Sequence, residues 1–160
     1  MVAITYDHEV ISSIPPARLF NAFIVNGDEL IPKVLPQAIK SVEILEGDGG
    51  AGSIKVTTFG EGSQFKSVKQ QVEALDKENY VYKYSVIEGD ALQDVVEKVS
   101  YEVQILPSSG DGGSICKTKS TYHTKGDAQI SEDDIKAGKE KAGFLFKAVE
   151  AYLIAHPDLY

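Results

Sequence analysis

The sequence predicts an α+β protein with a seven-stranded antiparallel sheet and a long helix near its C-terminal end. Two observations predict this class. Through most of residues 39–124 apolar and polar side chains alternate with a period of two, whereas the residues after 131 repeat at helical spacing. Strands and helices are thus segregated along the chain, which favours an antiparallel sheet over βαβ units. A sheet curled around one long helix would bury its concave face against that helix.

The first elements are one strand and two short helices. Residues 2–12 alternate loosely and predict the first strand. Ser13 is a suitable helix cap, and the prolines that follow it suit a first helical turn. Gly27 interrupts the helical spacing, and a second short helix is expected over residues 29–34, before Pro36.

Six further strands follow, separated by turn-forming residues. In the fifth of these, Val95 and Val99 are predicted to face the same way as Tyr101, and Val96 to face the opposite way. The six predicted strands cover residues 39–46, 53–59, 64–74, 80–87, 95–106 and 114–124.

The glycine-rich segment 46–52 has the composition of a phosphate-binding loop but not its context. Such a loop opens a helix and ends in Gly-Lys-Ser/Thr, whereas strand-like sequence begins here at Ser53. We therefore predict a tight reversal between two strands, in which glycines supply positive φ angles.

The last element is a long helix that begins after Ser131. This serine can cap the helix, and three acidic residues occupy the first turn, where the helix dipole favours them. The pair His156-Pro157 ends the pattern. The predicted apolar stripe comprises Ile135, Ala142, Leu145, Phe146, Val149, Tyr152 and Leu153.

Composition limits the classes of function. The chain has 160 residues, which suits one domain spanning residues 1–160, and its net charge is −8. An acidic protein without a basic run repels nucleic acid, so we expect no nucleic-acid partner. One cysteine excludes an intrachain disulfide, and no histidine pair has metal-ligand spacing, so we expect neither metal nor cofactor.

The sequence also bears on location. No apolar run is long enough to cross a bilayer. The first seven residues lack a basic segment followed by an apolar run, so we expect no secretory signal and a cytoplasmic protein.

The predicted inner face of the sheet is rich in hydroxyl groups. Alternation groups Tyr80, Tyr82 and Tyr84 on one face of a strand, and it places Tyr101 and Tyr122 on the corresponding faces of two others. Each buried tyrosine hydroxyl needs a partner, and a core without polar atoms is the usual choice. Two interpretations stay open: a lumen for water or an amphipathic ligand, or a filled core in which the hydroxyls pair with one another.

Three segments together resemble the pathogenesis-related class ten family of plants, typified by the major birch pollen allergen. They are the glycine-rich segment continued to Lys55 (residues 46–55), then Tyr-Ser-Val-Ile-Glu-Gly-Asp (84–90), then Lys-Ser-Thr-Tyr-His-Thr-Lys-Gly-Asp (119–127). The resemblance runs over nearly the whole chain.

The resemblance implies a helix-grip fold, in which the sheet holds the long helix above two short supporting helices. It also implies a large hydrophobic cavity that binds flavonoids, cytokinins, steroids or fatty acids. Members accumulate in the cytosol during pathogen attack and stress, and many are allergens. We therefore expect a monomeric, non-enzymatic binder of one such small molecule.

By the same resemblance, nine residues are expected to line the pocket. Lys55 would meet an anionic or carbonyl group of the ligand, balanced by Asp28; alternatively, the two form a purely structural ion pair. The expected lining residues are Phe23, Asp28, Lys55, Phe59, Phe65, Tyr82, Tyr84, Tyr101 and Leu145.

Two alternative functions follow from related proteins. A weak ribonuclease would use Lys55, Glu97, Glu150 and Tyr152, yet acid–base chemistry at neutral pH favours histidines, and the three here are far apart in sequence. An abscisic-acid-receptor-like signalling protein would need a Ser-Gly-Leu-Pro-Ala gate and a His-Arg-Leu latch. This chain has Val-Ile-Glu-Gly-Asp at residues 86–90 and no His-Arg-Leu.

Overall fold

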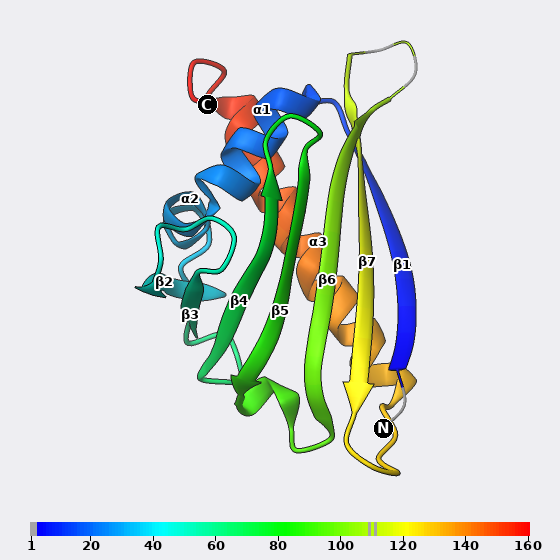
Figure 1. The fold of residues 1–160 in the computed structure, drawn as a ribbon. Coiled ribbons are helices and arrows are strands. Elements are labelled where there is room, and N and C mark those ends of the chain that lie inside the picture. Colours follow the sequence, from blue (N-terminus) through cyan, green and yellow to red (C-terminus); the bar gives the residue numbers. More distant parts are fainter. Residues whose placement is uncertain (1–2, 109, 111) are drawn as a thin grey trace.

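One antiparallel sheet of seven strands curves around the C-terminal helix (Figure 1). The computed structural model describes residues 3–108, 110 and 112–160, so Val2, where the predicted first strand began, lies outside the described residues. Neighbouring strands follow the order β1-β7-β6-β5-β4-β3-β2, which confirms the predicted class. The strands are β1 (Ala3–Ser12), β2 (Ile39–Glu46), β3 (Ile54–Phe59), β4 (Ser67–Asp76), β5 (Val81–Gly89), β6 (Val96–Pro107) and β7 (Ser114–Thr124).

The short helices lie between β1 and β2. The structure corrects their predicted starts: α1 begins at Pro16 with Pro15 at its N-cap position and no capping side chain, so Ser13 does not cap it. Because Pro15 is extended, with ψ of 150°, the helix cannot start earlier. The second helix begins at Gly27 rather than at residue 29. The helices are α1 (Pro16–Phe20), a π-helical turn (Asn21–Val25), α2 (Gly27–Val34), a short 3₁₀ turn (Asp90–Leu92) and α3 (Glu132–Ala155).

Both ends of α3 are fixed by side chains. At its start, the Ser131 hydroxyl accepts hydrogen bonds from the backbone N–H groups of Asp133 and Asp134, at 3.1 and 3.3 Å, which confirms the predicted cap. At its end, Arg18 of α1 donates to the carbonyl oxygens of Leu153 and His156, at 2.7 and 2.8 Å. These bonds satisfy carbonyls that a helix end leaves without intrahelical partners.

A β-bulge at the start of β6 overturns one predicted orientation. Val96 was expected to face outward, yet it is buried with Val99 on the inner side. The register shifts between Val96 and Lys98, which pair with Thr124 and His123. The extra residue, Glu97, changes the phase of the alternation and so brings both valines to one face.

The glycine-rich segment joins β2 to β3, as predicted. Gly47 adopts a φ of +90°, and a Cβ there would lie 2.4 Å from the Ser53 hydroxyl. That hydroxyl accepts a hydrogen bond of 2.9 Å from the backbone N–H of Gly49. The segment therefore folds onto its own serine as a turn.

Buried apolar residues form two separate clusters. The first lies between α1, α2, the second half of α3 and the strands β6 and β7, and we call it the packed end. The second lies against β4, β5 and β6 near the 3₁₀ turn and contains Val68, Val86, Leu92, Val96 and Val99. The packed end comprises Ile14, Leu19, Phe20, Ala22, Leu30, Val103, Ile105, Cys116, Phe146, Val149 and Leu153.

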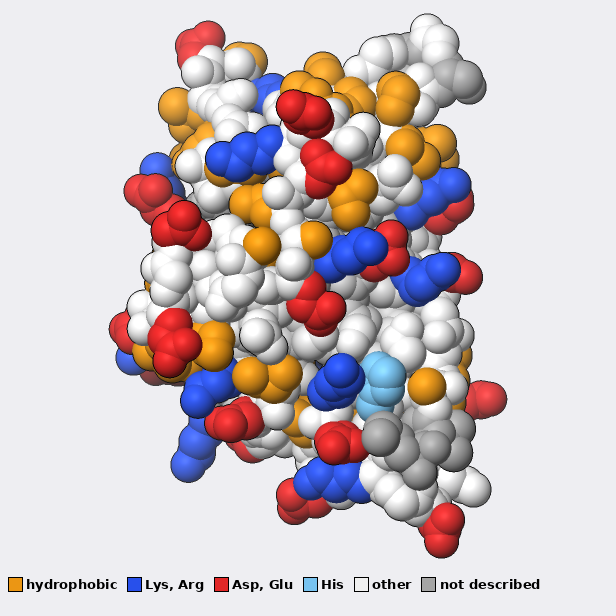
Figure 2. Space-filling view, viewed as in Figure 1, with side chains coloured by type: hydrophobic (Ala, Val, Ile, Leu, Met, Phe, Trp, Pro, Cys, Tyr) orange, Lys and Arg blue, Asp and Glu red, His pale blue; other side chains and the backbone are white. Residues whose placement is uncertain are grey.

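The face of the sheet turned away from α3 carries interspersed acidic and basic side chains (Figure 2). Three ion pairs join directly opposed residues of neighbouring strands: Lys69 with Glu88, Lys83 with Glu102, and Glu9 with Lys117. Exposed pairs of this kind contribute little to stability, and they mark this face as solvated.

Candidate ligand-binding site

Stacked tyrosines cover the middle of the inner face. Tyr82 and Tyr84 are alternate residues of β5, so they share a face, and Tyr84 pairs directly with Tyr101 of β6. Their rings lie close: the centroids are 5.1 Å apart for Tyr82 and Tyr84, and 4.9 Å apart for Tyr84 and Tyr101. The register of two strands thus brings together three of the residues expected to line a pocket.

Two further tyrosines extend this row to the edge of the sheet. The side chain of Tyr101 is hydrogen-bonded to that of Tyr122 on β7. The Tyr122 ring meets Tyr6 of β1 edge-on, with centroids 5.9 Å apart. We call Tyr82, Tyr84, Tyr101, Tyr122 and Tyr6 the tyrosine row; it crosses β5, β6, β7 and β1.

These tyrosines are removed from bulk water but not fully enclosed by protein. Burial raises the pKa values of Tyr82 and Tyr84 far above the ordinary value for a tyrosine. It also raises the pKa of Tyr101 well above that value. Nevertheless, all three side chains keep part of their surface accessible. The three rings therefore lie deep in the structure without being completely covered by protein atoms, as they would be in a close-packed core.

On α3 as well, an inner position is left uncovered. Ala142 occupies the same helical face as Ile135 and Val149, seven residues to either side, and both of these are buried. Ala142, which belongs to the predicted apolar stripe, is itself exposed. A Cβ built on Gly138 would meet no atom of the described residues within 4 Å, apart from its own helix backbone and chain neighbours. We call this region, with the tyrosine row, the open half.

An ion pair lies near the tyrosine row. Lys55 of β3 is buried, and its Nζ lies 2.7 Å from the Asp28 Oδ2 atom of α2. Asp28 also contributes to the raised pKa of Tyr82, after the larger effect of burial, so the pair lies near one end of the tyrosine row. A buried ammonium requires such a partner. The structure thus confirms that these two predicted residues meet.

The other predicted residues are dispersed around this centre. Phe23 lies 5.6 Å from Phe146, centroid to centroid, beside the packed end. Phe59 packs against the second apolar cluster. The centroid of the Phe65 ring lies 5.7 Å from the Lys141 Nζ atom. Leu145 is half-buried on α3.

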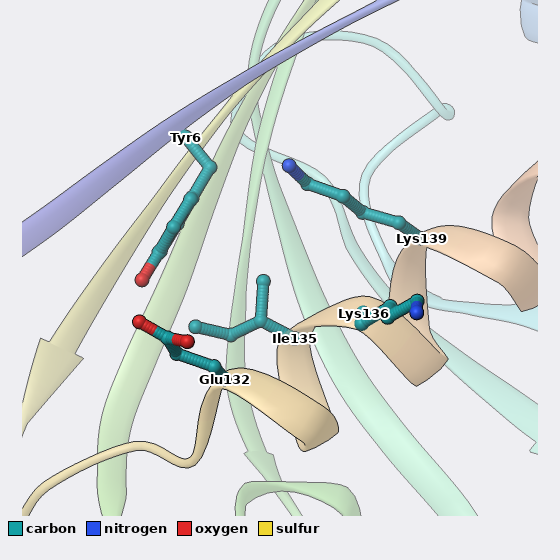
Figure 3. A pocket seen from close by; sticks show the side chains of 5 residues that line it. All are labelled: Tyr6, Glu132, Ile135, Lys136 and Lys139. Carbon is teal, nitrogen blue, oxygen red and sulfur yellow. The ribbon is translucent and has the colours of Figure 1, made fainter.

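A surface pocket lies where the open half reaches the sheet edge (Figure 3). Its volume is about 240 Å³, and it lies between β1 and the first half of α3. The Lys139 Nζ atom is 5.1 Å from the centroid of the Tyr6 ring. Sequence reasoning missed both residues, although Tyr6 shares its strand parity with the half-buried Ile4 and Val10. The lining residues are Tyr6, Glu132, Ile135, Lys136 and Lys139.

The residues of the ribonuclease alternative occupy different surroundings. Lys55 forms an ion pair with Asp28, and the Glu150 Oε1 atom lies 3.6 Å from the Lys147 Nζ atom. Tyr152 stacks on His156, whereas Glu97 is exposed in the bulge that begins β6. The start of β6 and the end of α3 lie at opposite ends of the molecule (Figure 1).

The described residues hold neither a cluster of metal-ligating side chains nor a helix that could cross a membrane. Among the described residues, no three His, Cys, Asp or Glu side chains cluster as a metal site. None of the helices that the structure describes is long and apolar enough to cross a membrane. The single cysteine, Cys116, is buried, and burial raises its thiol pKa.

A curved antiparallel sheet wrapped around one long helix defines the helix-grip class of proteins. The profile of the pathogenesis-related protein Bet v 1 family matches residues 1–156. The chain belongs to this family, as the sequence motifs indicated.

Curated relatives with high identity are named as fruit allergens. Major strawberry allergen Fra a 1-2 of Fragaria ananassa is 61% identical over 160 residues, 100% of this chain and 99% of the relative. Major allergen Mal d 1 of Malus domestica is 58% identical over 156 residues, 98% of this chain and 97% of the relative.

Solved structures agree with the fold. The crystal structure of Ara h 8.0201 is 39% identical and has a TM-score of 0.85, covering 97% of this chain and 100% of that one. Norcoclaurine synthase from Thalictrum flavum, solved in complex with dopamine and hydroxybenzaldehyde, is 23% identical and has a TM-score of 0.73. The match covers 97% of this chain and 88% of that one. The latter likeness concerns the fold alone.

Proposed function

We propose that this protein binds hydrophobic or amphipathic small molecules in the open half, between α3 and the tyrosine row. The observation that carries the proposal is the coincidence of two surfaces: desolvated but incompletely covered tyrosine rings, and an exposed Ala142 on the helix face opposite them. Apolar surface left uncovered inside a protein favours an apolar occupant.

The chemistry of the walls defines the class of ligand. Flat aromatic faces offer stacking contacts to a planar molecule, and tyrosine hydroxyls offer a few directional hydrogen bonds. Flavonoids, cytokinins, steroids and fatty acids combine a large apolar body with few polar groups, as this lining requires.

Binding requires no covalent step in this proposal. Lys55, which would be the natural amine nucleophile, is held by Asp28 at 2.7 Å. The ammonium of this ion pair can donate a hydrogen bond to a carbonyl group of the ligand. We therefore propose a non-enzymatic, monomeric binder that acts in the plant cytoplasm during defence or stress, and an allergen like its named relatives.

The test fills the proposed site from the helix side. Ala142→Leu places a larger side chain opposite the tyrosine row, whereas Ala137→Leu makes the same change on the outward side of α3 and serves as the control. We expect Ala142→Leu to weaken the affinity for the neutral fluorescent probe N-phenylnaphthylamine about tenfold, since a ligand must then displace or avoid the new side chain. Titration of probe fluorescence measures this.

Stability separates this effect from misfolding. Since Ala142 is exposed, the leucine meets free space, and we expect the free energy of unfolding of both variants to stay within about 1 kcal/mol of the original protein. Equal probe affinity in the Ala142→Leu and Ala137→Leu variants would contradict the proposed site.

A further inference from the structure

We propose that the pocket between β1 and α3 is a subsite for the anionic headgroup of an amphipathic ligand, and that Lys139 is the residue that selects it. This inference rests on the proposed function, because the ligand's apolar body is assigned to the open half. It adds a chemical class, an acid rather than a neutral molecule, and a residue that distinguishes the two.

The pocket adjoins the proposed ligand site through shared residues. Tyr6 belongs to the pocket and also ends the tyrosine row, where it meets Tyr122. Ile135 is buried, and it shares its helical face with Ala142. An apolar body lying along the tyrosine row would therefore bring its polar end to this edge of the sheet.

The position of Lys139 suits an anion. Its side chain reaches from α3 toward β1, whereas Lys136 points away from Tyr6 (Figure 3). Its ammonium lies over the Tyr6 ring, and no ion pair within the described part of the chain includes it. A cation–π contact leaves the other N–H donors of the ammonium available, so a carboxylate or sulfonate could bind Lys139 without displacing it from the ring.

The other inner lysine does not compete for this role. Lys55 already has a carboxylate partner, Asp28, at 2.7 Å. An anionic ligand at Lys55 would meet the repulsion of that carboxylate, whereas Lys139 requires no exchange of partners.

Glu132 also lines the pocket and opposes an anion. It precedes Lys139 by seven residues, which places it on the same helix face about 10 Å away along the axis. In Figure 3 its carboxylate lies toward the Tyr6 hydroxyl and away from the Lys139 ammonium. An anion in contact with the Lys139 ammonium is therefore farther from the Glu132 carboxylate than from Lys139, so the attraction exceeds the repulsion, although the repulsion should be measurable.

Two probes that differ by one charged group test the inference. Anilinonaphthalene sulfonate and N-phenylnaphthylamine share their aromatic rings, but only the first is an anion. We expect Lys139→Gln to raise the Kd of the sulfonate probe about fivefold and to leave that of the neutral probe within about twofold. Lys139→Arg should retain sulfonate affinity, and Glu132→Gln should strengthen it slightly.

The control variant is Lys147→Gln, which removes the same charge from an exposed position farther along α3. It should leave both Kd values unchanged. If the original protein binds both probes and Lys139→Gln leaves the ratio of their Kd values unchanged, the inference is wrong and the proposed function stands. If neither probe binds the original protein, the proposed function fails, and the inference fails with it.

Discussion

The two halves of α3 meet the sheet in different ways. In the packed end, Val149 and Leu153 are fully buried against α1, α2 and the sheet, and Arg18 binds the last helix carbonyls. In the open half, the face-central position of α3 is the small, exposed Ala142, and the opposing strands carry tyrosines.

The difference shows how one helix can serve two purposes. A protein of this size needs a close-packed core for stability, and the packed end supplies one. The open half lacks that packing and leaves aromatic surface uncovered. We expect this to lower the stability of the protein, and the packing of the packed end to compensate. We expect this division to be visible when each half is altered separately.

The largest expected effect lies in the packed end. Leu153→Ala should lower the free energy of unfolding by about 3 kcal/mol, since it removes a fully buried side chain and leaves a cavity. Leu145→Ala, on the same helix but half-buried, should cost about 1 kcal/mol. Urea denaturation measures both. Equal losses would mean that the two halves are packed alike.

The ion pair of the open half gives the next largest effect. Asp28→Asn leaves the buried Lys55 ammonium without its counter-charge, and we expect a loss of about 2 kcal/mol in unfolding free energy. Lys55→Met removes the charge instead and should change stability by less than about 1 kcal/mol. Urea denaturation measures the unfolding free energy of both variants. If Lys55→Met lowers it as much as Asp28→Asn does, the ion pair itself stabilises the fold.

A further effect concerns alkaline pH. Burial raises the folded-state pKa of Tyr82, Tyr84 and Tyr101 above the value near 10 of an unfolded chain. Above pH ~10 the unfolded chain therefore binds fewer protons than the folded protein, so stability is complete below that pH and falls as pH rises. Each such tyrosine should contribute a slope of up to about 1.4 kcal/mol per pH unit.

Ultraviolet absorbance of ionised tyrosine provides the measurement. Of the eight tyrosines, Tyr82, Tyr84 and Tyr101 should ionise only when the protein unfolds. If all eight ionised together near pH 10 in the folded protein, the rings of the open half would be in contact with bulk water.

Much of this architecture could be predicted from local pattern. Alternation located every strand, and the Ser131 cap and the glycine-rich turn were correct because each depends on neighbours within a few residues. The orientation of Val96 was wrong because a bulge depends on the partner strand and leaves no mark on the periodicity. The start of α1 was wrong because Pro15 extends the chain beyond the expected cap.

The candidate site was predictable only in part. The family resemblance predicted that Asp28 and Lys55 lie together, and strand alternation predicted that Tyr82 and Tyr84 share a face. The meeting of Tyr6 with Lys139 joins residues more than a hundred positions apart, and no local pattern indicates it.

By itself, the sequence determined the order of elements, the two faces of most strands and the family, because these depend on residue type and short spacing. Only the tertiary structure decided that Ala142 stays exposed within an apolar stripe and that the tyrosines form one row. The physical reason is that periodicity indicates which way a side chain faces. The distance between the helix and the sheet decides whether other side chains cover that side chain.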